Sequence, residues 1–116
     1  MARVLLDHHS RICRPRRLTA STVTPNDVRE CTITYTELCN RAGSPNLAHF
    51  GGRFYGEIAS WCRENGWPPL NSLVVRVDTG EPGEGYNGAG EGFCSTAQWG
   101  DQVADCIAFV GYPSTA

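Results

Sequence analysis

The chain has 116 residues, of which 41% are hydrophobic and 19% charged, and its formal net charge is −2. This length suits one domain with a real core, and the composition excludes both a disordered chain and a membrane-embedded one. No window approaches the ~20 uninterrupted apolar residues of a membrane-spanning helix. The first residues hold no apolar stretch of secretory-signal length, so we expect a cytoplasmic protein.

The first 23 residues differ from the rest in charge. They carry five arginines against one aspartate, a balance of +4, whereas residues 24–116 carry five arginines against eleven carboxylates, a balance of −6. Pro15 and the Ser/Thr-rich run from Leu18 to Thr24 disfavour regular structure. We therefore predict a basic, flexible leader over residues 1–23, dispensable for folding, and a single domain over residues 24–116.

Three helices are predicted at the start of this domain. Thr24-Pro25 is a helix-start signature, and the helix that it begins ends near Cys31. A T-x-x-E capping box starts a second helix at Thr34, and Gly43 ends it. A third helix is expected from about residue 53 to residue 65, before Gly66. Its apolar stripe consists of Phe54, Ile58, Trp61 and Cys62.

Beyond the third helix the pattern changes. Leu70, followed by the run from Leu73 to Val77, predicts a strand because these residues are largely β-branched. Asp78 to Gly80 predicts a turn, and the Gly-rich stretch from Gly80 to Gly92 predicts a loop or loose hairpin. A last amphipathic helix is expected from Ser95 to about Phe109. The whole pattern predicts a small α+β domain with a C-terminal helix.

Six cysteines are present, and no pair has C-x-x-C spacing. Cys39 and Cys62 fall on apolar helix stripes, where a free cysteine behaves as a small hydrophobe. In a cytoplasmic protein we therefore expect core-filling thiols, with disulfides or a metal site as the alternatives. We expect no metal and no cofactor. A catalytic pairing of His49 with Cys62 is disfavoured, because burial silences a thiol.

Short helices, a longer helix, a strand and a Gly-rich loop follow one another in the order of a winged helix. The segments from Thr34 to Gly43, from Pro69 to Val75 and from Gly80 to Tyr86 resemble the DNA-binding domain of alkylguanine-DNA alkyltransferases and alkyltransferase-like proteins. That family has a T-Y-G-E-(I/L)-A helix, a recognition helix, an active-site segment P-C-H-R-V-V and a G-x-G-Y turn. The resemblance covers roughly residues 33–86 and implies a winged helix whose third helix enters a DNA groove.

The chain departs from this family at the reactive position. The alkyl-accepting cysteine would fall near Leu70 or Asn71, and neither side chain can accept an alkyl group. The family's R-A-V-G recognition pattern is also not reproduced, and Gly51-Gly52-Arg53 is its nearest equivalent. We therefore expect a non-enzymatic nucleic-acid-binding module of winged-helix type, with no catalytic residues.

The predicted nucleic-acid contacts begin on the outer side of the third helix, where arginine offers a bidentate fork to phosphates and base edges. Glu57 and Glu64 lie on the same side, so an ordinary solvated face is the alternative. The Gly80–Gly92 stretch is interpreted as a wing, a phosphate-cradling loop or a plain solvent loop. The predicted site residues are Arg53, Ser60, Arg63, Asn71, Arg76 and Tyr86.

The acidic balance of residues 24–116 favours a second function. Phosphate binding normally depends on clustered basic residues, which this segment lacks. The alternative is a small interaction protein, encoded by a phage or mobile element, that docks its acidic surface on a host protein. The predicted partner is therefore either nucleic acid or a host protein.

Overall fold

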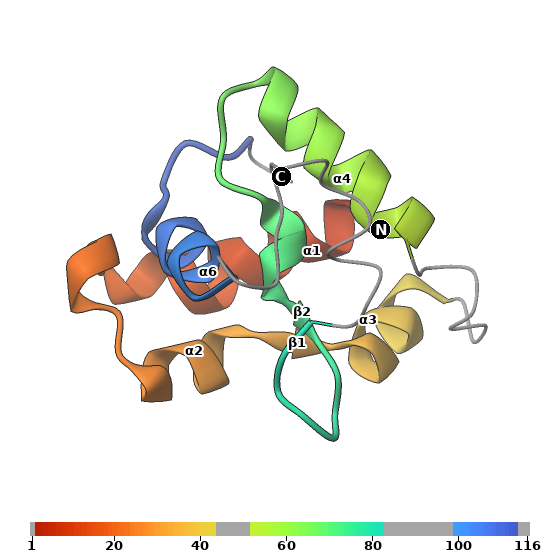
Figure 1. The fold of residues 1–116 in the computed structure, drawn as a ribbon, viewed down its shortest axis with the longest axis horizontal. Coiled ribbons are helices and arrows are strands. Elements are labelled where there is room, and N and C mark those ends of the chain that lie inside the picture. Colours follow the sequence, from red (N-terminus) through yellow and green to blue (C-terminus); the bar gives the residue numbers. More distant parts are fainter. Residues whose placement is uncertain (1, 44–51, 83–98, 114–116) are drawn as a thin grey trace.

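The computed structural model describes residues 2–43, 52–82 and 99–113 (Figure 1). The fold is mixed α+β and mostly helical, and its strands form a two-stranded parallel sheet that pairs Ile33 with Val74 and Thr34 with Val75. The α-helices are α1 (Ala2–His8), α2 (Pro25–Cys31), α3 (Tyr35–Ala42), α4 (Gly52–Glu64) and α6 (Trp99–Ala108). The strands are β1 (Ile33–Thr34) and β2 (Val74–Val75). A π-helical turn (His9–Cys13) and 3₁₀ turns (Arg14–Arg16, Ala20–Thr22, Leu70–Leu73) complete the elements.

The helix ends lie close to the predicted positions. The Thr24 hydroxyl accepts the backbone N–H of Asp27 at the start of α2, and the Thr34 hydroxyl caps α3 in the same way. Gly43 and Gly66 follow α3 and α4 with φ angles of 74° and 71°, a conformation that favours glycine. Helix α6 is described only from Trp99, and residues 95–98 of the predicted helix lie outside the described residues.

The prediction of a flexible leader over residues 1–23 is wrong. Residues 2–16 are continuously helical, and Leu5, His8, His9 and Cys13 are buried in the core. These four positions have the i, i+3, i+4 and i+8 spacing of one helix face, with histidines where an apolar residue would be expected. Arg16 adds ion pairs to Asp27 and Glu30 of α2, with N–O distances of 3.2 and 2.6 Å. The predicted boundary at residue 24 therefore separates no independent unit.

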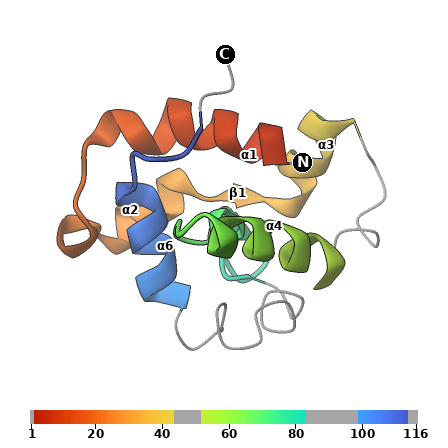
Figure 2. The same cartoon turned by 90° about the horizontal axis from the view of Figure 1, so that it is seen from above.

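The two adjacent histidines bind α1 to two other helices. The His8 Nε2 donates to the Cys31 carbonyl at the end of α2, and the His9 Nε2 donates to the Cys106 carbonyl in α6, each over 2.7 Å. The His9 ring also packs edge-on against Tyr112, with ring centroids 4.8 Å apart. Figure 2 shows the helical segment of residues 2–16 running across the molecule, with α3 near its first end and α6 nearer its other end. The N-terminal helix is thus an integral part of the core.

The predicted strand over residues 70–77 is also wrong in most of its length. Leu70–Leu73 forms a 3₁₀ turn, and only Val74 and Val75 pair with β1. The chain then turns away, because the Arg76 N–H bonds the Glu81 carbonyl and the Gly80 N–H bonds the Arg76 carbonyl. All six residues from Leu70 to Val75 are buried, so the segment runs through the core and does not alternate between core and solvent.

The described residues can be compared with the predictions about thiols and membrane-spanning helices. Five cysteines are buried free thiols, namely Cys13, Cys31, Cys39, Cys62 and Cys106, so the thiol prediction is confirmed for these five. Cys94 lies outside the described residues. None of the described helices has the length and apolar character needed to cross a bilayer.

The burial of Leu5 predicts a large loss of stability on truncation. The side chain is 0% exposed, so Leu5→Ala should lower the free energy of unfolding by roughly 2–5 kcal/mol through cavity formation. The control Val77→Ala, at a side chain that is 72% exposed, should change it by less than about 0.5 kcal/mol. Urea denaturation measures both values. Equal stability of the Leu5 variant and the wild type would show that α1 does not pack on the core in solution.

The buried histidines predict that stability falls in mild acid. Burial lowers the pKa of both His8 and His9 below the ordinary value of 6.5, so below pH 6.5 the unfolded chain binds more protons than the folded protein. The free energy of unfolding should therefore decrease as the pH falls from about 7 to about 5, by up to about 1.4 kcal/mol per pH unit for each histidine. Urea titrations across this range should show the slope, and it should be smaller in His9→Gln. A flat profile in the wild type would contradict the burial of these rings.

Candidate functional site

Helix α4 carries three of the predicted contacts. Arg53, Ser60 and Arg63 all belong to this helix, and the side chains of Ser60 and Arg63 are exposed. The Arg53 side chain lies outside the described residues. Ile58 and Cys62 face the core, which leaves the opposite side of α4 in solvent. Glu57 and Glu64 are exposed as well, so both signs of charge occur on this helix.

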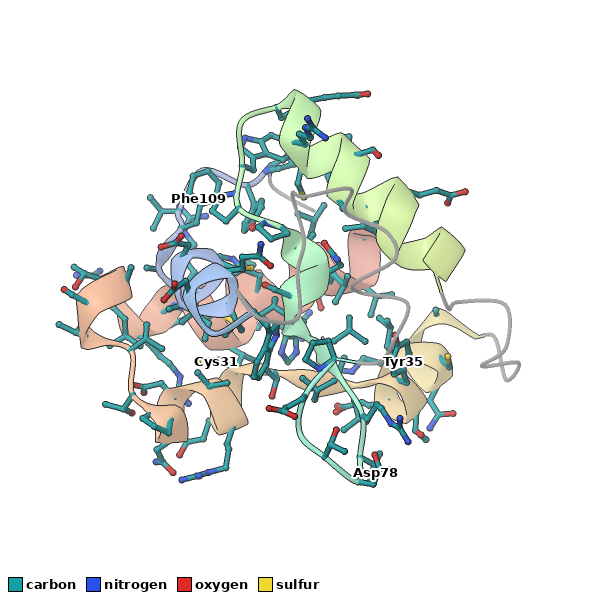
Figure 3. All side chains as sticks on the ribbon, in the orientation of Figure 1. Cys31, Tyr35, Asp78 and Phe109 are labelled. Atoms are coloured by element: carbon teal, nitrogen blue, oxygen red, sulfur yellow. The ribbon has the colours of Figure 1, made fainter. Side chains whose placement is uncertain are left out.

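The other three predicted contacts do not join α4. Asn71 is 0% exposed, so its prediction as a contact residue is wrong: the 3₁₀ turn that holds it packs against α4 and α6. Arg76 is exposed, and its guanidinium binds the Asp78 carboxylate over 2.9 and 3.1 Å. Figure 3 places Asp78 at the tip of a loop on the opposite side of the molecule from α4. Tyr86 lies outside the described residues.

A surface that the sequence analysis missed lies on the outer side of the N-terminal helix. Arg3, Asp7, Arg11 and Arg14 follow one another at intervals of four, four and three residues, the spacing of a single helix face. The Arg11 Nε binds Asp7 Oδ1 over 3.0 Å, which agrees with this alignment. We call this surface, extended by the exposed Arg17, the arginine face. Its spacing was visible in the sequence, but the prediction of a flexible leader concealed it.

The four arginines of the arginine face differ in whether they form an ion pair within the protein. Arg3, Arg14 and Arg17 make no ion pair with any residue among 2–43, 52–82 and 99–113. Arg11 is 74% exposed in its side chain despite its contact with Asp7. Because an exposed pair is weakly bound, both its members remain available to a ligand. The N-terminal segment therefore presents four exposed arginines and one partly exposed carboxylate.

A hollow of about 570 Å³ lies where this face meets α3. Six of its lining residues come from the N-terminal helix, and one, Arg41, comes from α3. This volume is within the usual range for a small-ligand site, about 300–1,000 Å³. The lining holds three guanidinium groups and one carboxylate, a balance of +2. The lining residues are Arg3, Val4, Asp7, His8, Arg11, Ile12 and Arg41.

His8 forms the buried part of this lining. Its Nε2 is occupied by the Cys31 carbonyl, and its Nδ1 has no hydrogen-bond partner among the described residues. With Nε2 as the donor, the neutral ring carries its lone pair on Nδ1. Burial lowers the pKa of His8, and the charge of Arg41 acts in the same direction, whereas the hydrogen bond to Cys31 and the charges of Glu37 and Asp7 act against them. The ring is therefore held neutral next to a cationic hollow.

These features favour binding of an anion. Three arginines from two helices surround one space, and arginine forms forked hydrogen bonds with phosphate and carboxylate groups. Within the described parts of the chain, no group of three or more His, Cys, Asp or Glu side chains could hold a metal ion. Comparisons with protein-family models, with curated proteins and with solved structures give no match to this chain.

Proposed function

We propose that the protein is a non-enzymatic nucleic-acid-binding module of winged-helix type. The winged-helix part of the proposal rests on element order, since α2, α3 and α4 precede β2 as in that fold. The observation that carries the nucleic-acid part is the arginine face, because it presents Arg3, Arg11 and Arg14 on the helical segment of residues 2–16 and Arg17 directly after it.

The arginine face offers a basic surface in a protein whose residues 24–116 are too acidic to favour nucleic-acid binding. Residues 24–116 have a balance of −6, which disfavours an approach of nucleic acid to most of this segment. Of the five arginines of residues 1–23, Arg16 is ion-paired with Asp27 and Glu30, and the other four are exposed on a segment that packs in the core. Phosphates would therefore approach the N-terminal segment. Helix α4, with Ser60 and Arg63 exposed, is the second surface to be compared by experiment.

Binding of a short labelled DNA duplex, followed by fluorescence anisotropy over a range of salt concentrations, tests this proposal. Wild type should bind at low salt, and Arg14→Ala/Arg17→Gly should weaken binding by about tenfold or more. The slope of log K against log salt should fall by roughly two units, because each neutralised phosphate contributes about 0.9. Glycine is chosen at position 17 because Arg17 has a φ of 52°.

Two further variants complete the design. Arg29→Ala/Arg76→Ala removes the same charge from exposed positions outside the arginine face, and it should retain most of the affinity. Arg53→Ala/Arg63→Ala measures the part that α4 contributes. Absence of binding by wild type at low salt would refute the nucleic-acid function. The acidic surface would then be tested as a docking site for a basic protein partner.

A further inference from the structure

We propose that the hollow between α1 and α3 is a binding site for a phosphomonoester of nucleotide size. The guanidinium groups of Arg3, Arg11 and Arg41 would hold the phosphate, and Val4 and Ile12 would contact the organic part. This inference goes beyond the proposed nucleic-acid binding and does not depend on it, since its ligand is defined by one terminal phosphate group.

The fold brings the three arginines to one hollow, and two of them also take part in exposed ion pairs. Arg3 and Arg11 lie eight residues apart on the N-terminal helix, and Arg41 faces the same hollow from α3. Arg11 uses its Nε to bind Asp7 over 3.0 Å, and Arg41 uses its Nη2 to bind Glu37 over 2.8 Å. Each guanidinium has five N–H donors, so these exposed pairs leave most of the donors available.

The number of hydrogen-bond donors favours a phosphomonoester over a carboxylate. The lining residues have a balance of +2, and Glu37, which binds Arg41, lowers the local balance to +1, so the hollow attracts anions. A phosphomonoester is nearly dianionic at neutral pH. Its three terminal oxygens can accept hydrogen bonds from several guanidinium groups at once, whereas a carboxylate has two oxygens and one charge. Three arginines around one space therefore select the phosphate group.

The volume of the hollow leaves room for a ligand larger than phosphate alone. About 570 Å³ leaves room for an organic part beside the anion. Val4 and Ile12 offer apolar contact there, and Ile12 is 36% exposed although it is a large hydrophobic residue. A planar aromatic ring can also stack on a guanidinium group. A nucleoside 5′-phosphate satisfies all three features.

His8 provides a readout inside the site. His8 is one of the residues that line the hollow, and the charges of Asp7, Glu37 and Arg41 act on its ring. A bound dianion near this ring would stabilise its protonated form and so raise the pKa of His8. His9 donates to Cys106 on the α6 side and does not line the hollow, so its signal serves as an internal control.

The first experiment is an NMR titration of the full chain with adenosine 5′-monophosphate at constant ionic strength. The ligand should shift the His8 ring signals and raise the pKa of His8, and adenosine at the same concentrations should do neither. Arg3→Ala and Arg41→Ala should each weaken binding by roughly tenfold, because each removes a charged hydrogen-bonding partner of the phosphate. Arg29→Ala is the matched control from α2 and should leave the affinity unchanged.

A second arm distinguishes a free nucleotide from the end of a strand. A short single-stranded oligonucleotide with a 5′-phosphate is compared with the same strand ending in a 5′-hydroxyl. If the protein prefers the phosphorylated strand and Arg41→Ala abolishes this preference, the site binds strand ends. If the protein binds the mononucleotide without that preference, the site binds a small ligand. The proposal is overturned if neither phosphate shifts His8, or if Arg29→Ala weakens binding as much as Arg41→Ala. Mononucleotide binding without duplex binding would retain this site and refute only the proposed function.

Discussion

The arrangement of the helices depends on two consecutive histidines in the N-terminal segment. Successive side chains on a helix point about 100° apart, so His8 and His9 reach different neighbours. Their Nε2 atoms bind the carbonyls of Cys31 and Cys106, which lie in the last turns of α2 and α6. The last carbonyls of a helix have no partner within it, and burying them unsatisfied would be costly. The two rings therefore donate to carbonyls at helix ends in the core, where the Cys106 carbonyl also accepts the Phe109 N–H over 3.3 Å. They fix three helical segments relative to one another.

The packing of the N-terminal segment in the core also determines which charges lie at the surface. Once Leu5, His8, His9 and Cys13 face inward, the other side of the same segment must present its arginines to solvent. Arg3, Arg11, Arg14 and Arg17 then become fixed features of the surface, whereas residues 24–116 are acidic in total. The hollow arises because α3 lies against α1 and adds Arg41 to the arginines of that helix. One side of the N-terminal helix thus packs in the core, and its other side lines the candidate anion site.

The segment from Leu70 to Val75 has a similar role in the second half of the chain. It is buried along its whole length, it packs against α4 and α6, and its last two residues pair in parallel with β1. Trp99 of α6 donates its indole N–H to the Ser72 carbonyl over 2.9 Å, and the Tyr112 hydroxyl donates to the Pro68 carbonyl over 2.6 Å. The backbone of this central turn is therefore held partly by side chains. A sheet of two residues in each strand adds little stability on its own.

Local features were predictable because neighbouring residues determine them. Thr24 and Thr34 cap helices through N–H groups three residues away, and Gly43 and Gly66 end helices by adopting positive φ angles. The apolar stripe of α4 likewise follows from its own period, which is why Ser60 and Arg63 were placed correctly at the surface. These signals act within one or two helical turns and need no tertiary contact.

Other features were decided by tertiary packing. Whether a helix with two histidines on its inner side is buried depends on carbonyls 23 and 97 residues away, which the local pattern cannot reveal. The burial of Asn71 depends on α4 and α6 closing around its turn, and the short β2 depends on where the chain bends after Val75. The spacing of Arg3, Arg11 and Arg14 was visible in the sequence, but only the packing of α1 on α3 brings Arg41 to the same hollow. The sequence by itself determined helix ends and apolar stripes through short-range contacts, and the tertiary structure decided which polar groups became core and which became surface.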